Sequence, residues 1–217
     1  MGDNMADMVF KYGTMNGGKT INILQTVCSY EENNFKVIVV KSIKDTKGED
    51  TILSRNGIGR KVDILLKENE SLLTEDNYKI YYTSKVILVD EVELLNETQI
   101  RELWMIAHLI NIPVICYGLK SNFKGEIFGP GVSQIFAIAD IIEEVGSSSL
   151  CRCGKKAIFN SRKVNDKFTD MGETIVIDDG SVSEIEYVPL CGDCYLKYVK
   201  INSDEAIKLA NLVDKIK

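Results

Sequence analysis

Short apolar runs alternate with amphipathic stretches along the first two thirds of the chain. Runs rich in β-branched residues occupy 35–42, 86–90 and 113–119, and Met8–Phe10 forms a shorter run near the start. Residues 96–111 carry apolar side chains at three- and four-residue steps, which is typical of an amphipathic helix. Strands that alternate with helices predict an α/β fold with a parallel sheet and right-handed crossovers. The loops that follow the strand carboxyl ends are then expected to form the active edge.

The pattern changes at the linker-like stretch 146–149. Beyond it lie short β-like pieces, and the runs 157–162 and 173–177 are expected to pair as a hairpin around Asn165-Asp166. Apolar positions at helical spacing predict a last helix over 203–217. We therefore expect an α/β domain over 1–146, a smaller β subdomain over 147–200 and a C-terminal helix over 201–217.

Composition and charge narrow the class of protein. The chain has 217 residues, of which 45% are hydrophobic and 27% charged, and this suits a domain of ordinary size with a small appendage. A net charge of −6 gives no basic surface of the kind that binds nucleic acid or an anionic membrane. No apolar run approaches the roughly 20 residues that span a bilayer, and no secretory signal is visible. We expect a cytoplasmic protein with no nucleic-acid or membrane partner.

Residues 13–20 read Gly-Thr-Met-Asn-Gly-Gly-Lys-Thr and match the phosphate-loop pattern G-x-x-x-x-G-K-T. The segment stands between an apolar run and a helical pattern, where a sheet delivers a loop onto a helix N-terminus. Lys19 is expected to reach the outer phosphates and Thr20 to offer its hydroxyl to Mg²⁺. The alternative is a Gly-rich turn with a solvated lysine, but the context favours binding of a nucleoside triphosphate. The expected phosphate contacts are Gly13, Thr14, Met15, Asn16, Gly17, Gly18, Lys19 and Thr20.

Two adjacent acids end the apolar run 86–90 and continue past it. Asp90 stands where a phosphate-loop enzyme holds its metal ion, and Glu91 follows directly. Because neighbouring side chains in an extended segment point to opposite sides, the two acids are expected to take different tasks. We assign Asp90 to Mg²⁺ and Glu91 to the substrate, where it accepts a proton from an acceptor hydroxyl. A phosphate-loop ATPase, in which the glutamate activates water, is the alternative that spacing leaves open.

Six cysteines divide into two groups. Cys28 and Cys116 stand in apolar patterns and are interpreted as small core residues. The other four form two close pairs, and in a chain without an export signal such pairs indicate a metal site before disulfides. The predicted ligands are Cys151, Cys153, Cys191 and Cys194.

These motifs together resemble the thymidine kinases of the type shared by bacteria, cellular cytosol and poxviruses. The family's G-x-M-x-x-G-K-[ST] loop is met with Met15 in the marked place, and its D-E-x-Q-F segment appears as Asp90-Glu91-Val92-Glu93-Leu94. Its downstream G-L-x-x-x-F-x-x-x-x-F pattern appears over 118–128. Members also carry paired zinc cysteines that flank a substrate loop, with a Tyr before the second pair that Tyr187 matches. The similarity covers about residues 8 to 197.

The resemblance implies an activity and a set of roles. The activity is transfer of the γ-phosphoryl group of Mg-ATP to the 5′-hydroxyl of thymidine, with Glu91 as general base and with Thr20 and Asp90 on Mg²⁺. ATP contacts extend from the phosphate loop to Asp90, Glu91, Val92 and Glu93. The nucleoside base is expected to contact Met15, Leu94, Phe123, Phe128 and Tyr187. A structural zinc ion on the four cysteines, a homotetramer and feedback inhibition by dTTP are further implications.

The chain departs from the family pattern at several positions. Glu93 replaces a neutral Gln, and Leu94 replaces an aromatic residue. Asp45-Thr46-Lys47 stands where many members have D-T-R, so Lys47 keeps the charge but loses the planar fork, and Arg55 is a second candidate cation on the phosphate side. These changes motivate an alternative function, a catalytically impaired nucleotide-binding regulator descended from the family.

The metal site and the substrate loop depart from the pattern as well. Cys151 and Cys153 are separated by one residue, whereas members show C-x-x-C, and one-residue spacing suits tetrahedral ligation less well. We expect four ligands, with a displaced Cys151 or a weak site as alternatives. The loop's usual Gly-Gly is replaced within 178–181 by Asp-Asp-Gly-Ser, which leaves the loop path and the base preference open.

Overall fold

The computed structural model describes residues 5–145, 149–174, 185–200 and 203–216. The chain forms two compact units, which are described separately. The first comprises 1–13, 18–120 and 127–146, and the second comprises 14–17, 121–126 and 147–217.

A six-stranded sheet forms the centre of the first unit, and every neighbouring pair of strands in it is parallel. The apolar runs expected as strands are confirmed. In the run 35–42, the strand begins two residues later than predicted. In spatial order the strands are β5 (Ile64–Leu66), β2 (Val37–Ser42), β6 (Val86–Asp90), β7 (Val114–Gly118), β1 (Met8–Tyr12) and β8 (Ile141–Glu144).

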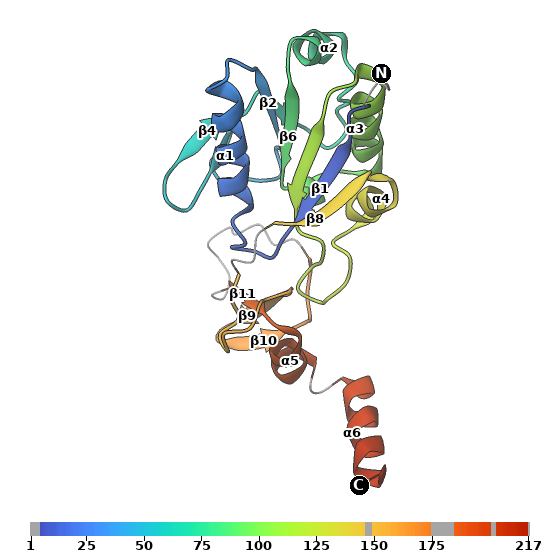
Figure 1. Cartoon of the computed structure of the whole chain (residues 1–217). Helices are drawn as coiled ribbons and strands as arrows, with labels where there is room; N and C mark the ends of the chain where they lie inside the picture. Colours follow the sequence, from blue (N-terminus) through green and yellow to red (C-terminus); the bar gives the residue numbers. More distant parts are fainter. Residues whose placement is uncertain (1–4, 146–148, 175–184, 201–202, 217) are drawn as a thin grey trace. The chain divides into compact units, whose positions relative to one another are not determined.

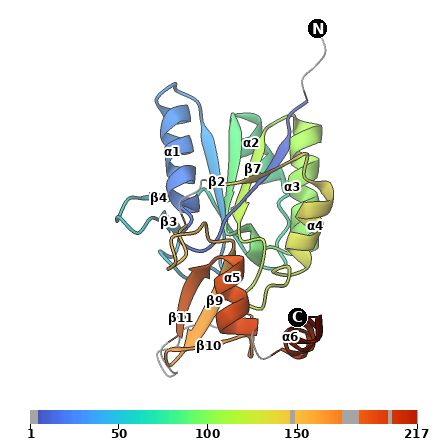
Figure 2. The same cartoon turned by 60° about the horizontal axis from the view of Figure 1, so that its bottom comes forward.

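Helices cover both faces of this sheet (Figures 1 and 2). Strand β2 shows how the two faces are built, because Val37 and Val39 pack with α1 (Lys19–Glu31) while Ile38 and Val40 belong to the core on the other face. This strand is buried on both sides, which explains its continuous apolar run. The opposite face carries α2 (Glu75–Tyr82), α3 (Glu97–Ile110) and α4 (Pro130–Ile138).

Local signals bound the helix that the periodicity predicts. The Gln99 backbone N–H donates to Asn96 Oδ1 at 2.9 Å, and the Asn96 backbone N–H donates to Gln99 Oε1 at 3.2 Å. This capping box starts α3, and Asn111 ends it in the left-handed region at φ 59°. The prediction of a helix over 96–111 is therefore confirmed to within its caps.

The second unit is built on a three-stranded antiparallel sheet with β9 (Phe159–Val164) in the centre. It pairs with β10 (Lys167–Thr169) across the turn at Asn165-Asp166, where both residues have positive φ, and with β11 (Ile185–Leu190) on the other side. The turn lies where the sequence predicts it. The strand that follows it is β10, not the predicted run 173–177, of which residues 175–177 lie outside the described residues.

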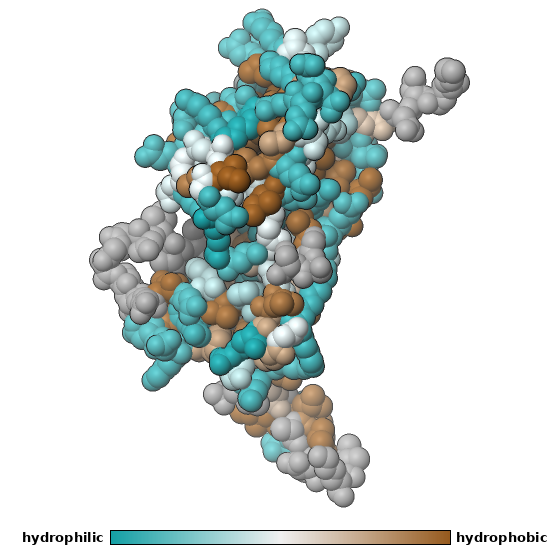
Figure 3. Space-filling view, turned by 60° about the vertical axis from the view of Figure 1, so that its left-hand side comes forward, coloured by the Kyte–Doolittle hydropathy of each residue, from teal (hydrophilic) through white to brown (hydrophobic). Residues whose placement is uncertain are grey.

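Helical segments follow this small sheet. They are α5 (Gly192–Tyr195), the π-helical η2 (Leu196–Lys200) and α6 (Asp204–Ile216), which confirms the predicted last helix. Among the described side chains of α6, those of Ile207, Leu209, Leu212 and Val213 are apolar and exposed. Figure 3 shows hydrophobic surface on this helix. Within the described residues, no helix is long and apolar enough to cross a membrane.

Candidate active site and cysteine centre

The two ends of the 13–20 loop belong to the first unit. The Gly13 N–H donates to the Gly118 carbonyl at 3.1 Å, which fixes the loop start to the end of β7. Gly18 adopts φ 78° as the N-cap of α1, and Lys19 begins the helix with only 7% of its surface exposed. Backbone N–H groups of a first helical turn bind anions readily, and the residue at the N-cap carries no competing side chain.

The middle of the loop, Thr14–Gly17, belongs to the second unit. The Gly17 N–H donates to the Thr14 carbonyl at 3.0 Å, and Asn16 adopts φ 66°. Two side chains hold Met15 by its backbone. Its N–H donates to Asn160 Oδ1 at 2.8 Å, and its carbonyl accepts from the Ser149 hydroxyl at 3.3 Å.

Asp90 lies at the carboxyl end of β6 and is 3% exposed. Burial and the nearby Glu91 carboxylate raise its pKa to about 7, while Lys19 acts in the opposite direction. A buried carboxylate whose ionised form is disfavoured without a neighbouring cation suits a magnesium ligand. Lys19 lowers the pKa of Asp90, so the two side chains lie near each other at the carboxyl edge of the sheet.

The chain turns sharply at Glu91 rather than remaining extended. Glu91 adopts the left-handed conformation at φ 47°, unusual for a residue with a side chain, and its N–H donates to Asp90 Oδ1 at 3.1 Å. A 3₁₀ turn, η1 (Val92–Leu94), follows directly. The expectation of an extended pair with opposed side chains is therefore wrong, because the strand ends at Asp90.

Glu93 lies inside η1 and is buried beside Glu91. Burial and then the Glu91 carboxylate raise the pKa of Glu93 well above its usual range, so the neutral acid is the favoured form. Its Oε2 has no hydrogen-bond partner among the described residues. A Cβ atom added at Gly118 would lie 2.4 Å from this oxygen and 2.7 Å from Val92 Cγ1, so glycine is required where β7 passes η1.

The two candidate cations lie on surface segments of the first unit. Lys47 is exposed, and its N–H donates to Asp45 Oδ1 at 3.1 Å. Asp45 is close enough to Asp90 to raise the pKa of that carboxyl slightly. Arg55 is exposed on the turn between β3 (Thr51–Leu53) and β4 (Gly59–Lys61).

Residues expected around the nucleoside base divide between the units. Leu94 and Phe128 are partly buried in the first unit, and Phe128 packs against its core. Phe123 is buried in the second unit, with the Arg162 guanidinium carbon 3.7 Å from its ring centre. Tyr187 lies directly opposite Arg162 on the neighbouring strand.

Asn160 and Arg162 contact two of the predicted site residues, Met15 and Phe123, and sequence reasoning missed both. Both are buried on β9, and Asn160 also donates from Nδ2 to the Ser121 carbonyl at 3.0 Å. Arg162 donates to the backbone carbonyls of Met171 and Glu173, the latter at 2.8 Å. The available signal was a polar and a basic residue at alternate positions of a predicted strand. Without knowledge of their partners, this pattern indicates only a strand face exposed to solvent.

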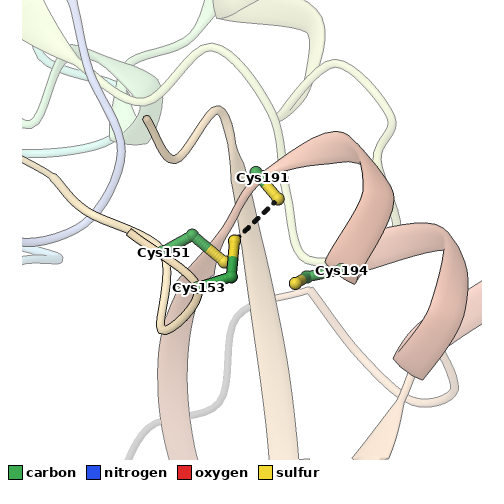
Figure 4. A group of neighbouring side chains, drawn as sticks. All are labelled: Cys151, Cys153, Cys191 and Cys194. Atoms are coloured by element: carbon green, nitrogen blue, oxygen red, sulfur yellow. Dashed lines mark hydrogen bonds between the residues drawn. The ribbon is translucent and has the colours of Figure 1, made fainter. Parts of the chain in front are cut away.

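The four paired cysteines converge at one point of the second unit (Figure 4). Their Sγ atoms all lie within 4.8 Å of one another, and those of Cys153 and Cys191 are 3.5 Å apart. Tetrahedral zinc with Zn–S bonds of about 2.3 Å requires sulfur separations of about 3.8 Å, so the cluster fits zinc. Cys28, in contrast, is exposed on α1, so its interpretation as a core residue is wrong, whereas Cys116 is buried as expected.

A turn resolves the one-residue spacing of the first pair. The Gly154 N–H donates to the Cys151 carbonyl at 2.8 Å, which folds Cys151 and Cys153 around a tight turn rather than along a strand. Burial alone would raise the pKa of the Cys151 thiol, but backbone N–H groups of Cys153 and Cys191 and neighbouring thiols bring it to about 6. Thiolate is the form that binds metal.

The only histidine and the only tryptophan lie together on α3, away from these motifs. The ring centres of Trp104 and His108 are 4.5 Å apart, and His108 Nε2 lies 3.1 Å from Asp140 Oδ2. The Met8 N–H donates to the same carboxylate oxygen at 2.7 Å. His108 therefore lies at the edge of the core, where it contacts Trp104 and Asp140.

Comparison with known proteins agrees with this arrangement. A family model described as thymidine kinase matches residues 6–195. The thymidine kinase of Francisella tularensis subsp. tularensis (strain SCHU S4) is 36% identical over 86% of this chain and 95% of its own length. That of Pasteurella multocida is 34% identical over 94% and 100%, and that of Lactococcus lactis is 33% identical over 89% and 98%.

Among solved structures, a DNA replication initiation factor aligns with 67% of this chain and 41% of its own, with a TM-score of 0.40 and 16% identity. So weak a likeness adds nothing to the assignment. The sequence matches define the class as a kinase, an enzyme that transfers a phosphoryl group. The chain belongs to the thymidine kinase family.

Proposed function

We propose that this chain is an active thymidine kinase that transfers the γ-phosphoryl group of ATP to the 5′-hydroxyl of thymidine and forms dTMP. The observation that carries the proposal is the buried pair of Lys19 and Asp90 at the carboxyl edge of the sheet, in a chain of this family. The phosphoryl group carries charge on its oxygens throughout transfer, so catalysis consists mainly of positioning and neutralisation.

Each end of the reaction has candidate groups. The 13–20 loop holds the donor phosphates, and Lys19 faces the outer ones. Thr20 and Asp90 hold magnesium, which supplies neutralisation of charge on the phosphate oxygens when bound. Glu91 accepts the proton of the 5′-hydroxyl, and its left-handed backbone directs it away from the strand path. Lys47 and Arg55 add positive charge on the phosphate side.

The base-binding residues are Met15, Leu94, Phe123, Phe128 and Tyr187. Apolar side chains hold the flat faces of a pyrimidine, and backbone groups read its edge. Asn160 supports this role because it holds the Met15 backbone at 2.8 Å, and Arg162 supports it because it stacks on Phe123.

Further proposals rest on family membership. We infer a structural zinc ion on the four cysteines, supported by their convergence. A homotetramer and feedback inhibition by dTTP are inferred from the resemblance alone. The cytoplasmic location is inferred from the composition, and the division of the chain at 146 and 200 from the change in sequence pattern. No finding favours the impaired alternative, since Lys19 and Glu91, which a degenerate site is expected to lose first, are both present.

The test is ADP formation from Mg-ATP with and without thymidine, deoxyuridine, deoxycytidine or deoxyguanosine. We expect turnover that requires a pyrimidine nucleoside, with thymidine accepted. ADP release without any nucleoside would favour an ATPase instead. Silence with all four nucleosides, together with ATP binding, would favour the impaired regulator.

The role of Glu91 is tested by Glu91→Gln, which keeps the size of the side chain but cannot accept the proton. We expect the turnover number to fall by about 100-fold or more while ATP binding changes little. Retained turnover would remove Glu91 from the role of general base. The exposed Glu97→Gln, at the start of α3, is a matched control expected to keep full turnover.

A further inference from the structure

Lys41 is a fully buried lysine for which the proposed reaction has no use so far. It lies on β2 directly beside Asp90 in the register of the two strands, and none of its surface is exposed. Its ammonium group donates to the carbonyls of Glu49 at 3.1 Å and Thr51 at 3.3 Å and to that of Lys47, and it lies 3.1 Å from Asp45 Oδ2.

These four oxygens come from one segment, residues 45–51, which wraps around the ammonium group. Gly48 and Glu49 both have positive φ, at 77° and 52°, and the Thr51 N–H closes the turn on the Gly48 carbonyl at 2.8 Å. Left-handed residues of this kind reverse the direction of backbone carbonyls, so several of them face the same centre. Asp45 completes the arrangement because its second oxygen holds the Lys47 N–H at 3.1 Å.

A buried charge of this kind is weak evidence for a role in stability. The free energy lost when two charges are removed from water is about as large as the free energy gained from their attraction. Proteins in which a buried ion pair is replaced by apolar residues are therefore often no less stable. What the ammonium group does provide is one fixed conformation for a short polar loop. That loop lies near the strand ends, since Asp45 influences the pKa of Asp90, and it carries Lys47.

We propose that Lys41 is a positioning residue for phosphoryl transfer, which holds the 45–51 loop in the conformation that presents Lys47 to the phosphates. This inference rests on the proposed function. Lys41 acts through Lys47 and itself contacts neither substrate. Its exclusion from water keeps the ammonium group bound to the loop rather than to phosphate oxygens.

A double-mutant cycle tests the connection, with Lys41→Met, Lys47→Gln and the two combined. Each single change is expected to lower kcat for thymidine by about 10- to 100-fold, because a displaced phosphate-side cation loses its effect in the transition state. The thymidine KM should change by less than about twofold. The combined variant should be no slower than Lys47→Gln alone. Losses that multiply, or full turnover in Lys47→Gln, would overturn the proposal.

Two further variants separate positioning from folding. Gly48→Ala leaves Lys41 in place but sets a Cβ 2.6 Å from the Thr51 carbonyl at a positive φ, so the loop must move. It should lower kcat as Lys41→Met does, and unchanged kcat would contradict the inference even if Lys41→Met fails to fold. Lys44→Met removes an exposed lysine that pairs with Glu68 at 2.7 Å, and it should keep wild-type kcat.

Amide hydrogen exchange distinguishes failure of this inference from failure of the proposed function. Exchange over residues 45–51 should be faster in Lys41→Met than in the wild type, and equal exchange would overturn the role of Lys41. The wild type could instead be inactive while Lys41→Met still accelerates exchange in the 45–51 loop. That result would overturn the kinase assignment, on which the role of Lys41 in phosphoryl transfer rests.

Discussion

At the scale of single residues, the replacement of an amide by an acid at position 93 matters less than its charge suggests. The sequence indicates an added negative charge near the triphosphate, whereas burial and Glu91 favour the neutral acid. A protonated carboxyl group has one donor and one acceptor and therefore resembles the amide that other family members carry. The raised pKa of Glu93 therefore acts toward the charge balance that an amide gives this position.

Glu93→Gln should consequently make stability less dependent on pH. The pKa of Glu93 in the folded chain is raised above its ordinary value near 4.5, so above that pH the unfolded chain loses this proton first. The free energy of unfolding of the wild type then falls as pH rises, by at most about 1.4 kcal/mol per pH unit from this group. Urea unfolding of both proteins between about pH 5 and 8 measures the difference.

The variant should lose less stability over this range and should keep its kcat. Asp90, whose pKa is also raised, is present in both proteins, so its contribution cancels in the comparison. Parallel pH profiles for the two proteins would mean that Glu93 is ionised in the folded state.

Residues that act through distant partners were beyond sequence reasoning. Lys19 and Asp90 could be predicted because each stands at a fixed place relative to a strand or helix. Asn160 could not, because its partner Met15 lies 145 positions away and nothing local marks the pair. Lys41 was hidden for a different reason, since a lysine at the end of an apolar run usually indicates a strand leaving the core.

At the scale of elements, the sequence predicted long buried strands and the helix α3 well, because several residues share each pattern. The strands β3, β4 and β5 have three residues each, too few to show a period, and α2 has an average hydrophobicity too low to mark it from sequence. The turn at Glu91 was missed because nothing in the sequence marks an acid at the end of a strand as adopting the left-handed backbone conformation.

The crossing of β7 and η1 leads to a prediction for Gly118→Ala. The added methyl group would overlap Val92 and Glu93, so the free energy of unfolding should fall by about 1–3 kcal/mol. kcat should fall as well, because η1 follows Glu91 directly. Gly192→Ala is a suitable control, since its Cβ would meet Phe159 at an ordinary 4.0 Å. Equal urea midpoints for Gly118→Ala and the wild type would show that the crossing has room to relax.

At the scale of the whole molecule, the cysteine centre takes the place of a large core in the second unit. Its buried cluster is small, with Cys151, Ala157, Leu190, Cys191 and Tyr195, and two of the five members are proposed ligands. A core of this size supplies little burial energy, so a metal ion is expected to provide much of the stability. The sequence predicted that these four cysteines come together, but not the turn that reconciles the spacing of the first pair.

Cys194→Ser should therefore lower bound zinc from about one ion per chain and lower the thermal midpoint, whereas Cys28→Ser should change neither. Cys28 is an exposed thiol on the other unit, which makes it a matched control. Metal analysis of the purified chains together with thermal unfolding checks this. Full zinc content in Cys194→Ser would mean that three sulfurs and another donor suffice.

The contact of Trp104 with His108 gives the protein an intrinsic fluorescence probe of its folded state. Because the chain has one tryptophan, every change in indole emission arises from this position on α3, 4.5 Å from an imidazole ring. The imidazole in turn meets Asp140, which binds the start of β1, so emission will follow the integrity of this edge of the sheet. Fluorescence can thus follow unfolding of the α/β unit while a chelator removes the zinc ion proposed for the cysteine centre, and one sample then gives the order of the two events.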